Sequence, residues 1–383
     1  MQQNQHAHIK SDRLIFKPDD VDLSRSPLRN GLKEKTFVLG AFNPGLCRLS
    51  NGNLLMMVRV AEALTDPVVN DKAHCIRWEA SGNYTTDSWP LQDVVRVDPR
   101  KFSIKAYGFP VYALTSLSWL LPVELNADGS RVEMIHYDKI IAPEFASQEY
   151  GIEDPRISLI DGRYYMTVCC VSSERHSTML YASEDGLNYN CMGVVLDHQN
   201  KDMLLFEGTI GKKYFALTRP MGECYFASSP GSLYHPGAAI HMATSPDLLH
   251  WKPMNQPFIR ARRASLSNEK IGGGTPPILT KDGWLILYHG VQQSGGAVGV
   301  YRTFWALMDR NDPLKVLRLE DITPLLEANE NLTIDIQHQA YLQHVVFTTG
   351  IVAHGNDYII VSGELDLACR ITHILKEYFS LEQ

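Results

Sequence analysis

The stretch Gly151-Ile-Glu-Asp-Pro-Arg-Ile-Ser-Leu-Ile-Asp-Gly-Arg-Tyr-Tyr-Met166 joins two strand-like runs through an Asp-Gly turn. Its first part places two carboxylates, a proline and an arginine on consecutive positions. Proline fixes its own φ and disfavours the α region for the residue before it. Neighbouring side chains of an extended segment point to opposite faces, so Glu153 and Asp154 are predicted to face different ways. A turn capped by Asp154 would explain the same residues without any function.

A glycine turn followed by a short apolar strand recurs along the whole chain. It is found at Gly52, Gly162, Gly211, Gly283 and Gly355. A second unit recurs as Ser183-Glu-Asp-Gly-Leu-Asn-Tyr189 and Ser245-Pro-Asp-Leu-Leu-His-Trp251. Short strands with Gly and Asp turns and few helical stretches indicate an all-β repeat protein. Five copies predict a five-bladed β-propeller, whereas a pair of sandwiches would not explain the repeated unit.

Three segments fall outside this repeat. Residues 1–36 are polar and mixed, and are predicted to form a lead-in or arm before a propeller domain of residues 37–383. Residues 62–110 are the least regular part, and we expect this excursion to cover a neighbouring subunit or to rim the active site. Residues 366–379 carry the one plausible helical pattern, which predicts a short C-terminal helix.

Composition and charge exclude several classes of protein. The formal net charge is −7 and no stretch is strongly basic, which argues against a nucleic-acid-binding protein. No run of about 18 apolar residues is present to span a membrane. Residues 1–11 lack the apolar core of a secretory signal, and the seven cysteines are scattered without a Cys-x-x-Cys pair. These features predict a protein with reduced thiols in the cytoplasm.

Polar residues embedded in apolar strands are the candidates for the site of a propeller, because inner strands converge at one end of its channel. Each such residue taken alone is more often structural. Several cations with few carboxylates favour an anion such as phosphate. No P-loop and no cluster with metal-ligand spacing is present, which argues against a nucleoside triphosphatase and a metal centre. The set comprises Asn43, Arg59, Asp154, Arg156, Arg219, Lys270, His289 and Asp366.

Nine short motifs, in their order along the chain, carry a resemblance to a known family. They are Phe42-Asn43-Pro44-Gly45, Arg59-Val60, Leu114-Thr115-Ser116-x-Ser118, Gly151-x-Glu153-Asp154-Pro155-Arg156, Asn200-Lys201-Asp202, Arg219-Pro220, Lys270-Ile271-Gly272, Tyr288-His289-Gly290 and Gly363-x-x-Asp366. Together they resemble glycoside hydrolase family 130. The resemblance implies a five-bladed propeller that acts on β-mannosides. Most members are inverting phosphorylases, which yield α-mannose 1-phosphate, and some are hydrolases.

The resemblance also implies roles for individual residues. Asp154 looks like the catalytic acid, which passes its proton through a hydroxyl of the bound mannose. Lys201 stands where many members have an arginine, and lysine keeps the charge without the bidentate fork. No cofactor and no metal is implied beyond inorganic phosphate as co-substrate. The implied substrate-binding residues are Asn43, Arg59, Ser118, Glu153, Arg156 and Asp366, and the implied phosphate-binding residues are Lys201, Arg219, Lys270 and His289.

One departure from the family pattern leaves the reaction class open. Phosphorylases commonly read Phe-Pro-Glu-Lys where this chain reads Phe206-Glu-Gly-Thr209. Glu207, Glu223 and Glu269 are close in sequence to the presumed phosphate ligands, and in the family's hydrolases such glutamates activate water. An inverting hydrolase needs an acid and a base about 6.5–9.5 Å apart, whereas a phosphorylase needs only cations to position its nucleophile. The retained cations favour a β-mannosyl phosphorylase, and an inverting β-mannosidase is the alternative.

Two further readings belong to other classes. A non-catalytic sugar-binding propeller would use stacking aromatics and would not need Asp154. A mannosyltransferase would use a nucleotide-sugar donor on the same scaffold. The expected partners are a β-mannoside oligosaccharide and inorganic phosphate, with neither nucleic acid nor membrane, and a homo-oligomer is expected. The candidate stacking aromatics are Trp119, Tyr165, Tyr225, Tyr234 and Trp305.

Overall fold

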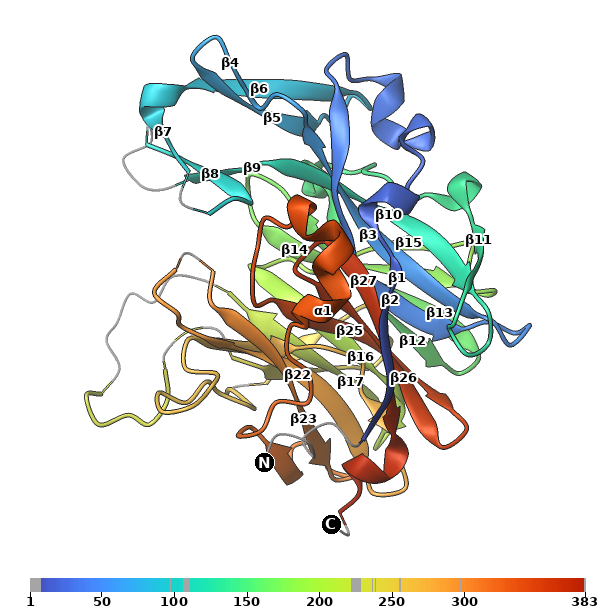
Figure 1. Cartoon of the computed structure of the whole chain (residues 1–383). Coiled ribbons are helices and arrows are strands. Elements are labelled where there is room, and N and C mark those ends of the chain that lie inside the picture. The colour runs from blue at the N-terminus through green and yellow to red at the C-terminus, as the bar shows by residue number, and fades with distance from the viewer. Residues whose placement is uncertain are drawn as a thin grey trace.

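Five antiparallel sheets make up most of this computed structural model, which describes residues 8–96, 98–105, 111–221, 229–235, 237, 239–254, 256–296 and 298–381 (Figure 1). Within these residues the fold is all β, with one α-helical turn, α1 (Glu330–Thr333). The connections contain 3-10 turns at Pro18–Asp20, Leu23–Arg25, Pro27–Asn30, Leu91–Asp93, Tyr137–Lys139, Ala146–Gln148, Ile334–Gln339 and Lys376–Phe379.

The five main sheets follow one another along the chain. The first has β2 (Thr36–Arg48), β3 (Leu54–Leu64), β10 (Ser116–Leu125) and β11 (Val132–Ile135), and the second has β12 (Ile152–Ile160), β13 (Arg163–Val171), β14 (His176–Ser183) and β15 (Asn190–Leu196). The third has β16 (Asn200–Ile210), β17 (Lys213–Pro220), β18 (His241–Ser245) and β19 (Lys252–Pro253). The fourth has β20 (Lys270–Gly273), β21 (Ile278–Leu279), β22 (Trp284–Gln292), β23 (Val300–Met308) and β24 (Val316–Glu320), and the fifth has β25 (Val346–His354), β26 (Asp357–Glu364), β27 (Ala368–Leu375) and β1 (Ile9–Phe16).

The first strands of these sheets lie against one another in sequence order. Strand β2 contacts β12, β12 contacts β16, and β16 contacts β20. The fourth sheet meets β25 through β22 and β23, and β25 returns to contact β2. Apolar side chains such as Trp119 and Trp305 are fully buried between the sheets. The first strands therefore bring polar residues from all five sheets to a common region.

The predicted glycine turns form the first hairpin of every main sheet. Gly52, Gly162, Gly211, Gly283 and Gly355 each lie between the first strand segment and the strand that follows. All five have a positive φ, from 52° to 138°, which glycine adopts at little cost. The second repeated unit links the third strand to the fourth in two consecutive sheets. The prediction of a repeated all-β unit is confirmed.

The predicted C-terminal helix is wrong over most of its length. Residues 368–375 form β27, a strand between β1 and β26, and only Lys376–Phe379 is a 3-10 turn. The β-branched residues Ile371, Thr372 and Ile374 favour a strand, and all but one residue of 368–374 is buried. A tight turn with positive φ at Leu365 and Asp366 starts the strand and excludes a helix there.

Residues 9–16 of the predicted lead-in segment 1–36 do not form a separate arm. These residues form β1, which pairs with β27 and joins the two ends of the chain in one sheet (Figure 1). Asp12 stabilises the pairing of β1 with β27, because its carboxylate accepts hydrogen bonds from Nε and Nη2 of Arg370, at 2.7 Å each. Arg370 Nη1 donates to Glu364 at 2.9 Å. The Arg370 side chain is 3 % exposed, so this ion-pair cluster is buried.

Replacing Asp12 with Ala is expected to lower the free energy of unfolding by about 3–5 kcal/mol, because the variant leaves Arg370 buried beside a single carboxylate. Lys10→Ala on the same strand is the control, because its ion pair with Asp357 is half exposed and such pairs contribute about 0–1 kcal/mol. Equilibrium denaturation measures both variants. Equal free energies of unfolding for the two variants would contradict the conclusion that Asp12 stabilises the pairing of β1 with β27.

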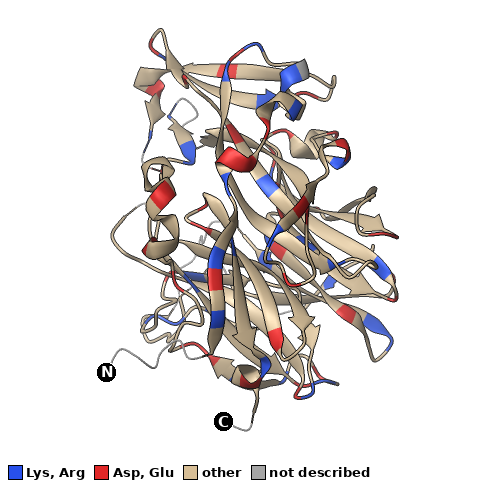
Figure 2. Cartoon of the chain, turned by 45° about the vertical axis from the view of Figure 1, so that its right-hand side comes forward, with Lys and Arg blue, Asp and Glu red and all other residues tan. Residues whose placement is uncertain are grey.

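The excursion after β3 forms two small sheets. One contains β4 (Val68–Val69), β5 (Lys72–Trp78) and β6 (Tyr84–Pro90), and the other contains β7 (Val94–Val95), β8 (Lys101–Ile104) and β9 (Val111–Leu114). They have their own small core, which includes Cys75 and Phe102. Figure 1 shows them as a cyan layer beside the main sheets. Figure 2 shows acidic and basic residues interspersed over the described chain. Among the described residues, no helix has the length and apolar character needed to cross a membrane.

Candidate active site

Eight of the predicted site residues line one cavity of about 860 Å³. They come from every main sheet. Asn43 is on β2, and Glu153 and Asp154 are on β12. The full set is Asn43, Arg59, Glu153, Asp154, Lys201, Arg219, Lys270 and Asp366.

Three consecutive first strands carry the same distortion where they border the site. Asn43, Asp154 and Asp202 have φ of 48°, 51° and 53°, and each lies within a break in the pairing register of its strand. Asn and Asp tolerate this left-handed conformation better than other non-glycine residues. The motif around Asn43 is therefore a bulge inside β2.

The bulge at Asp154 overturns the expectation that Glu153 and Asp154 face opposite ways. Both carboxylates reach Arg59, which donates from Nη2 to Glu153 at 2.8 Å and from Nη1 to Asp154 at 3.0 Å. Alternation holds only for regular extended backbone, and the left-handed residue breaks it. Asn43 Nδ2 also donates to Asp154, at 2.9 Å, so one carboxylate oxygen of Asp154 accepts two hydrogen bonds.

Burial and the surrounding charges shift the pKa values of the carboxylates in this site in different directions. Burial acts to raise the pKa of Asp154, but the positive charges of Arg59, Lys201 and Arg156 outweigh it and hold the pKa well below its ordinary value. Burial also acts to raise the pKa of Glu153, but the positive charges of Arg59 and Lys201 outweigh this effect and lower the pKa. At Asp366 burial prevails over the attraction of Arg100 and Arg59, and the pKa is raised. Asp154 is thus ionised in the field of these cations.

Each predicted phosphate ligand that is a cation already has an acidic neighbour. Lys201 Nζ lies 2.9 Å from Glu153, and Lys270 Nζ lies 3.5 Å from Glu269. Arg219 Nε lies 2.7 Å from a carboxylate oxygen of Asp202. These three cations are therefore paired with carboxylates. Donors stay available nonetheless, because Arg219 uses only Nε for Asp202 and each ammonium group has three N–H bonds.

His289 contributes no charge to this cluster. It is 1 % exposed and packs against Phe347, with ring centroids 4.6 Å apart. Burial and the charges of Arg219, Lys270 and Arg156 lower the pKa of its imidazole to about 3, so the ring is neutral. Any hydrogen bond that His289 gives to an anion is thus a neutral one.

Asp202 is a site residue to which the sequence analysis gave no role. Its side chain is 1 % exposed, and it lies 2.7 Å from Arg219, 3.8 Å from Arg156 and 3.9 Å from His289. A carboxylate buried among these groups fixes the position of Arg219 beneath the cavity. The Asn200-Lys201-Asp202 motif could have indicated this role for Asp202. An acid next to a presumed phosphate ligand needs a cation as its partner once it is buried.

Ser118 and Arg156 lie behind the wall of the cavity. Ser118 Oγ accepts a hydrogen bond from Arg59 Nε at 3.0 Å and so orients that guanidinium. Arg156 is 2 % exposed and donates to the carbonyls of Gly274 at 2.6 Å and Asp154 at 2.8 Å. Both residues hold groups that border the cavity, and neither lines it.

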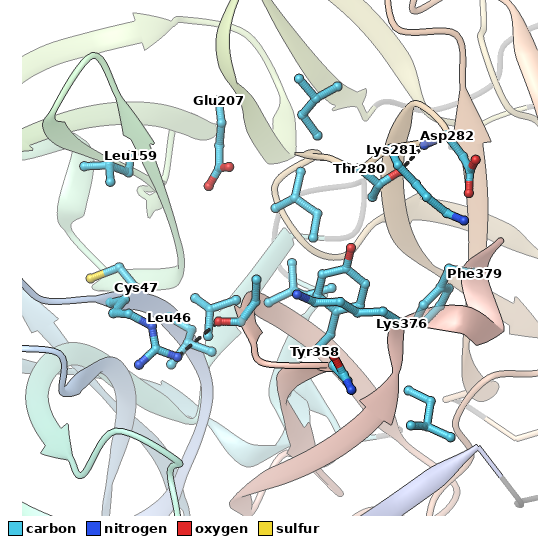
Figure 3. Close-up of a pocket in the computed structure, with 18 of the residues that line it drawn as sticks. Leu46, Cys47, Leu159, Glu207, Thr280, Lys281, Asp282, Tyr358, Lys376 and Phe379 are labelled. Atoms are coloured by element: carbon cyan, nitrogen blue, oxygen red, sulfur yellow. Dashed lines mark hydrogen bonds between the residues drawn. The ribbon is translucent and has the colours of Figure 1, made fainter.

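Two of the three glutamates proposed as a hydrolytic base do not line the candidate site. Glu207 lines a different cavity, of about 870 Å³, with Leu46, Leu159 and Tyr358 around it (Figure 3). Glu269 does not line the candidate site, although its carboxylate pairs with Lys270. Glu223 lies outside the described residues. Glu207 and Asp154 thus line different cavities.

Replacing Glu207 with Gln is expected to change kcat/KM for a β-mannoside less than about twofold, because the side chain enters neither the candidate site nor its hydrogen bonds. Steady-state kinetics with and without phosphate measure the effect. A loss of about 100-fold, the size typical of a removed acid–base group, would restore Glu207 as a base.

The excursion rims the candidate site, as one of its two predicted roles required. Trp89, Asp98, Arg100 and Lys101 all line the cavity from this segment. Of the aromatics proposed for stacking, the four that the structure describes do not line it: Trp119 and Trp305 are buried core residues, and Tyr165 and Tyr234 lie elsewhere. Tyr225 lies outside the described residues.

Comparisons with known proteins place the chain among enzymes that act on mannosides. A family model described as beta-1,4-mannooligosaccharide phosphorylase matches residues 106–379. A beta-1,2-mannobiose phosphorylase of Listeria innocua is 30% identical over 360 residues, which is 92% of this chain and 91% of that protein. A 1,2-beta-oligomannan phosphorylase of Thermoanaerobacter sp. is 30% identical over 246 residues, 63% of this chain and 74% of that protein. A solved structure of the Listeria innocua enzyme with beta-1,2-mannobiose has a TM-score of 0.78 at 27% identity, covering 96% and 98% of the two chains.

Proposed function

The chain belongs to glycoside hydrolase family 130, and on that premise we propose that it cleaves β-mannosides by phosphorolysis and releases mannose 1-phosphate. The reaction class is that of the mannoside phosphorylases to which the chain is similar. We also infer that the five main sheets are the five blades of a propeller. The cyclic order of contacts among the five sheets supports this inference.

The observation that carries the proposal is the composition of the cavity walls. One cavity contains a carboxylate held by Arg59 and Asn43, together with the cations Lys201, Arg219 and Lys270. An acid and a group of cations suffice for phosphorolysis, since phosphate is already an anionic nucleophile. Of the glutamates weighed as a base, those within the described residues do not line that cavity.

Asp154 is the proposed catalytic acid. The cations that keep its pKa low in the empty site include Lys201, which is also a proposed phosphate ligand. A phosphate dianion bound to Lys201 would offset that charge and raise the pKa of Asp154 toward the protonated form that an acid needs. Phosphate binding would thereby prepare the acid, and the route of the proton through a sugar hydroxyl stays a prediction.

Substrate contacts are assigned to the same cavity. We propose that Asn43, Arg59, Glu153 and Asp366 hold the mannose that is cleaved. Phosphate would approach from the side of Lys201, Arg219 and Lys270, and attack opposite the leaving group gives the α anomer of mannose 1-phosphate. The β-1,2 linkage is favoured over β-1,4, because a beta-1,2-mannobiose phosphorylase is similar over 92% of the chain. The homo-oligomer and the cytoplasmic location stay predictions from sequence.

The dependence of the initial rate on phosphate tests the proposal. With β-1,2-mannobiose as substrate, the rate is expected to be near zero without phosphate and to saturate as phosphate is added. Chloride at matched ionic strength should not replace it. A rate that is the same with and without phosphate would reject phosphorolysis and favour a β-mannosidase.

A further inference from the structure

A tight turn of the excursion delivers one arginine into the candidate site. The turn is Asp98-Pro99-Arg100-Lys101, in which the Asp98 side chain accepts from the backbone N–H of Arg100 at 3.0 Å. Thr115 ties the turn to the start of β10, because its N–H donates to the Arg100 carbonyl at 3.0 Å and its Oγ1 donates to the Pro99 carbonyl at 3.0 Å. Arg100 is thus fixed at the rim by backbone contacts rather than by its own side chain.

One edge of the Arg100 guanidinium binds Asp98 in the same turn. Nε donates to Asp98 Oδ1 at 2.9 Å and Nη2 donates to Oδ2 at 2.8 Å, which is a bidentate pair. The remaining group, Nη1, points toward Asp366, whose Oδ2 is 3.8 Å away. That distance is too long for a hydrogen bond, so Nη1 and Oδ2 face each other across a gap.

The backbone of Asp366, like that of Arg100, is fixed by local contacts. Its backbone carbonyl accepts a hydrogen bond from Tyr341 Oη at 2.9 Å, and its φ of 51° places it in a tight turn. The side chain is 14 % exposed and lines the cavity. Within the described residues, no hydrogen bond is donated to its carboxylate. Its carboxylate is therefore available to accept hydrogen bonds from a ligand in this cavity.

We propose that Arg100 is a substrate-binding residue that, together with Asp366, binds hydroxyl groups of the mannoside. A sugar hydroxyl accepts one hydrogen bond and donates another, so it can bridge Arg100 Nη1 and Asp366 Oδ2, or two adjacent hydroxyls can each take one partner. Asp98 is a positioning residue, which turns the free edge of Arg100 toward the cavity. This inference rests on the proposed function, and it assigns the excursion a part in recognising the sugar.

Arg100→Ala is expected to lower kcat/KM for β-1,2-mannobiose by about 10- to 100-fold, the range for a lost hydrogen bond to a charged group. The KM for phosphate should change less than about twofold. The acidic limb of the kcat/KM profile should move to higher pH, because the charge of Arg100 helps to keep the pKa of Asp366 down. Arg100→Lys keeps the charge without the fork, and should show an intermediate loss.

Asp98→Asn separates positioning from structure. Asparagine still accepts from the Arg100 N–H, so the turn is kept while the bidentate pair is lost. The variant should lose less activity than Arg100→Ala, and the double variant should be no worse than Arg100→Ala alone, because Asp98 acts through Arg100. Additive losses would contradict the positioning role.

Lys72→Ala is the control on the excursion, since Lys72 is exposed and does not line the cavity. Thermal unfolding of each variant checks the fold, and Arg100→Lys is the decisive variant if Arg100→Ala does not fold. Wild-type kcat/KM for the mannoside in a folded Arg100 variant would overturn the proposal, as would a raised KM for phosphate alone. Phosphate dependence of the wild type is measured separately, so failure of the proposed function is recognised independently.

Discussion

Replacing Asp154 with Asn is expected to lower kcat by about 10²- to 10⁴-fold, the contribution typical of a general acid. Asparagine keeps the shape of the side chain and can still accept from Asn43 and Arg59, so the bulge in β12 should persist. It cannot donate a proton to the leaving group. Steady-state turnover of β-1,2-mannobiose in saturating phosphate measures the loss, and circular dichroism checks the fold.

The pH profile of the wild type gives an independent check of Asp154. An acid works in its protonated form, so kcat should fall as pH rises through the pKa of Asp154 in the complex. Phosphate offsets the nearby positive charges that lower this pKa, so binding should raise it above its value in the empty site. Asp161→Asn, in the exposed turn after the same strand, is the matched control and should keep full activity. Near-normal turnover in Asp154→Asn would remove this residue from the mechanism.

Replacing Arg219 is the second change with a large expected effect, and it should act on phosphate rather than on the sugar. Arg219→Lys keeps a positive charge beside the buried Asp202 but loses the planar fork. We expect the KM for phosphate to rise about 10- to 100-fold, since each charge-assisted hydrogen bond is worth about 1.5–3 kcal/mol. Affinity for the mannoside should be nearly unchanged.

Arg219→Ala should have the larger effect on phosphate, but it also leaves Asp202 buried without its nearest cation and is expected to lower stability. The lysine variant is therefore the cleaner measurement. Lys213→Ala, at an exposed position of the same strand, is the control. A raised KM for the mannoside with unchanged phosphate kinetics would place Arg219 at the sugar instead.

Several features of the fold could be predicted because they depend on local chemistry. The five glycine turns are visible in sequence, since a left-handed turn between two apolar strands favours glycine. The motif residues of the site are also visible, because charges inside apolar strands need a reason to be there. The helical pattern at residues 366–379 misled, because a strand buried on both faces has no alternation to distinguish it from a helix.

The parts of the site that could not be predicted depend on contacts between distant segments. Nothing near Arg100 indicates that its turn reaches Asp366, which is 266 residues further along the chain. The shared contact of Glu153 and Asp154 with Arg59 depends on a bulge, and the Pro155 rule alone predicted extended backbone. The pairing of Lys201 with Glu153 and of Arg219 with Asp202 likewise depends on which carboxylates the fold brings close.

The identity of the products tests most directly the claim that phosphate is the nucleophile. The wild-type protein is incubated with β-1,2-mannobiose and phosphate, and the products are followed by proton and phosphorus nuclear magnetic resonance. Phosphorolysis predicts one α-mannose 1-phosphate and one free mannose for each disaccharide consumed. Two free mannose molecules for each disaccharide, with no phosphorus signal from a sugar phosphate, would contradict the account.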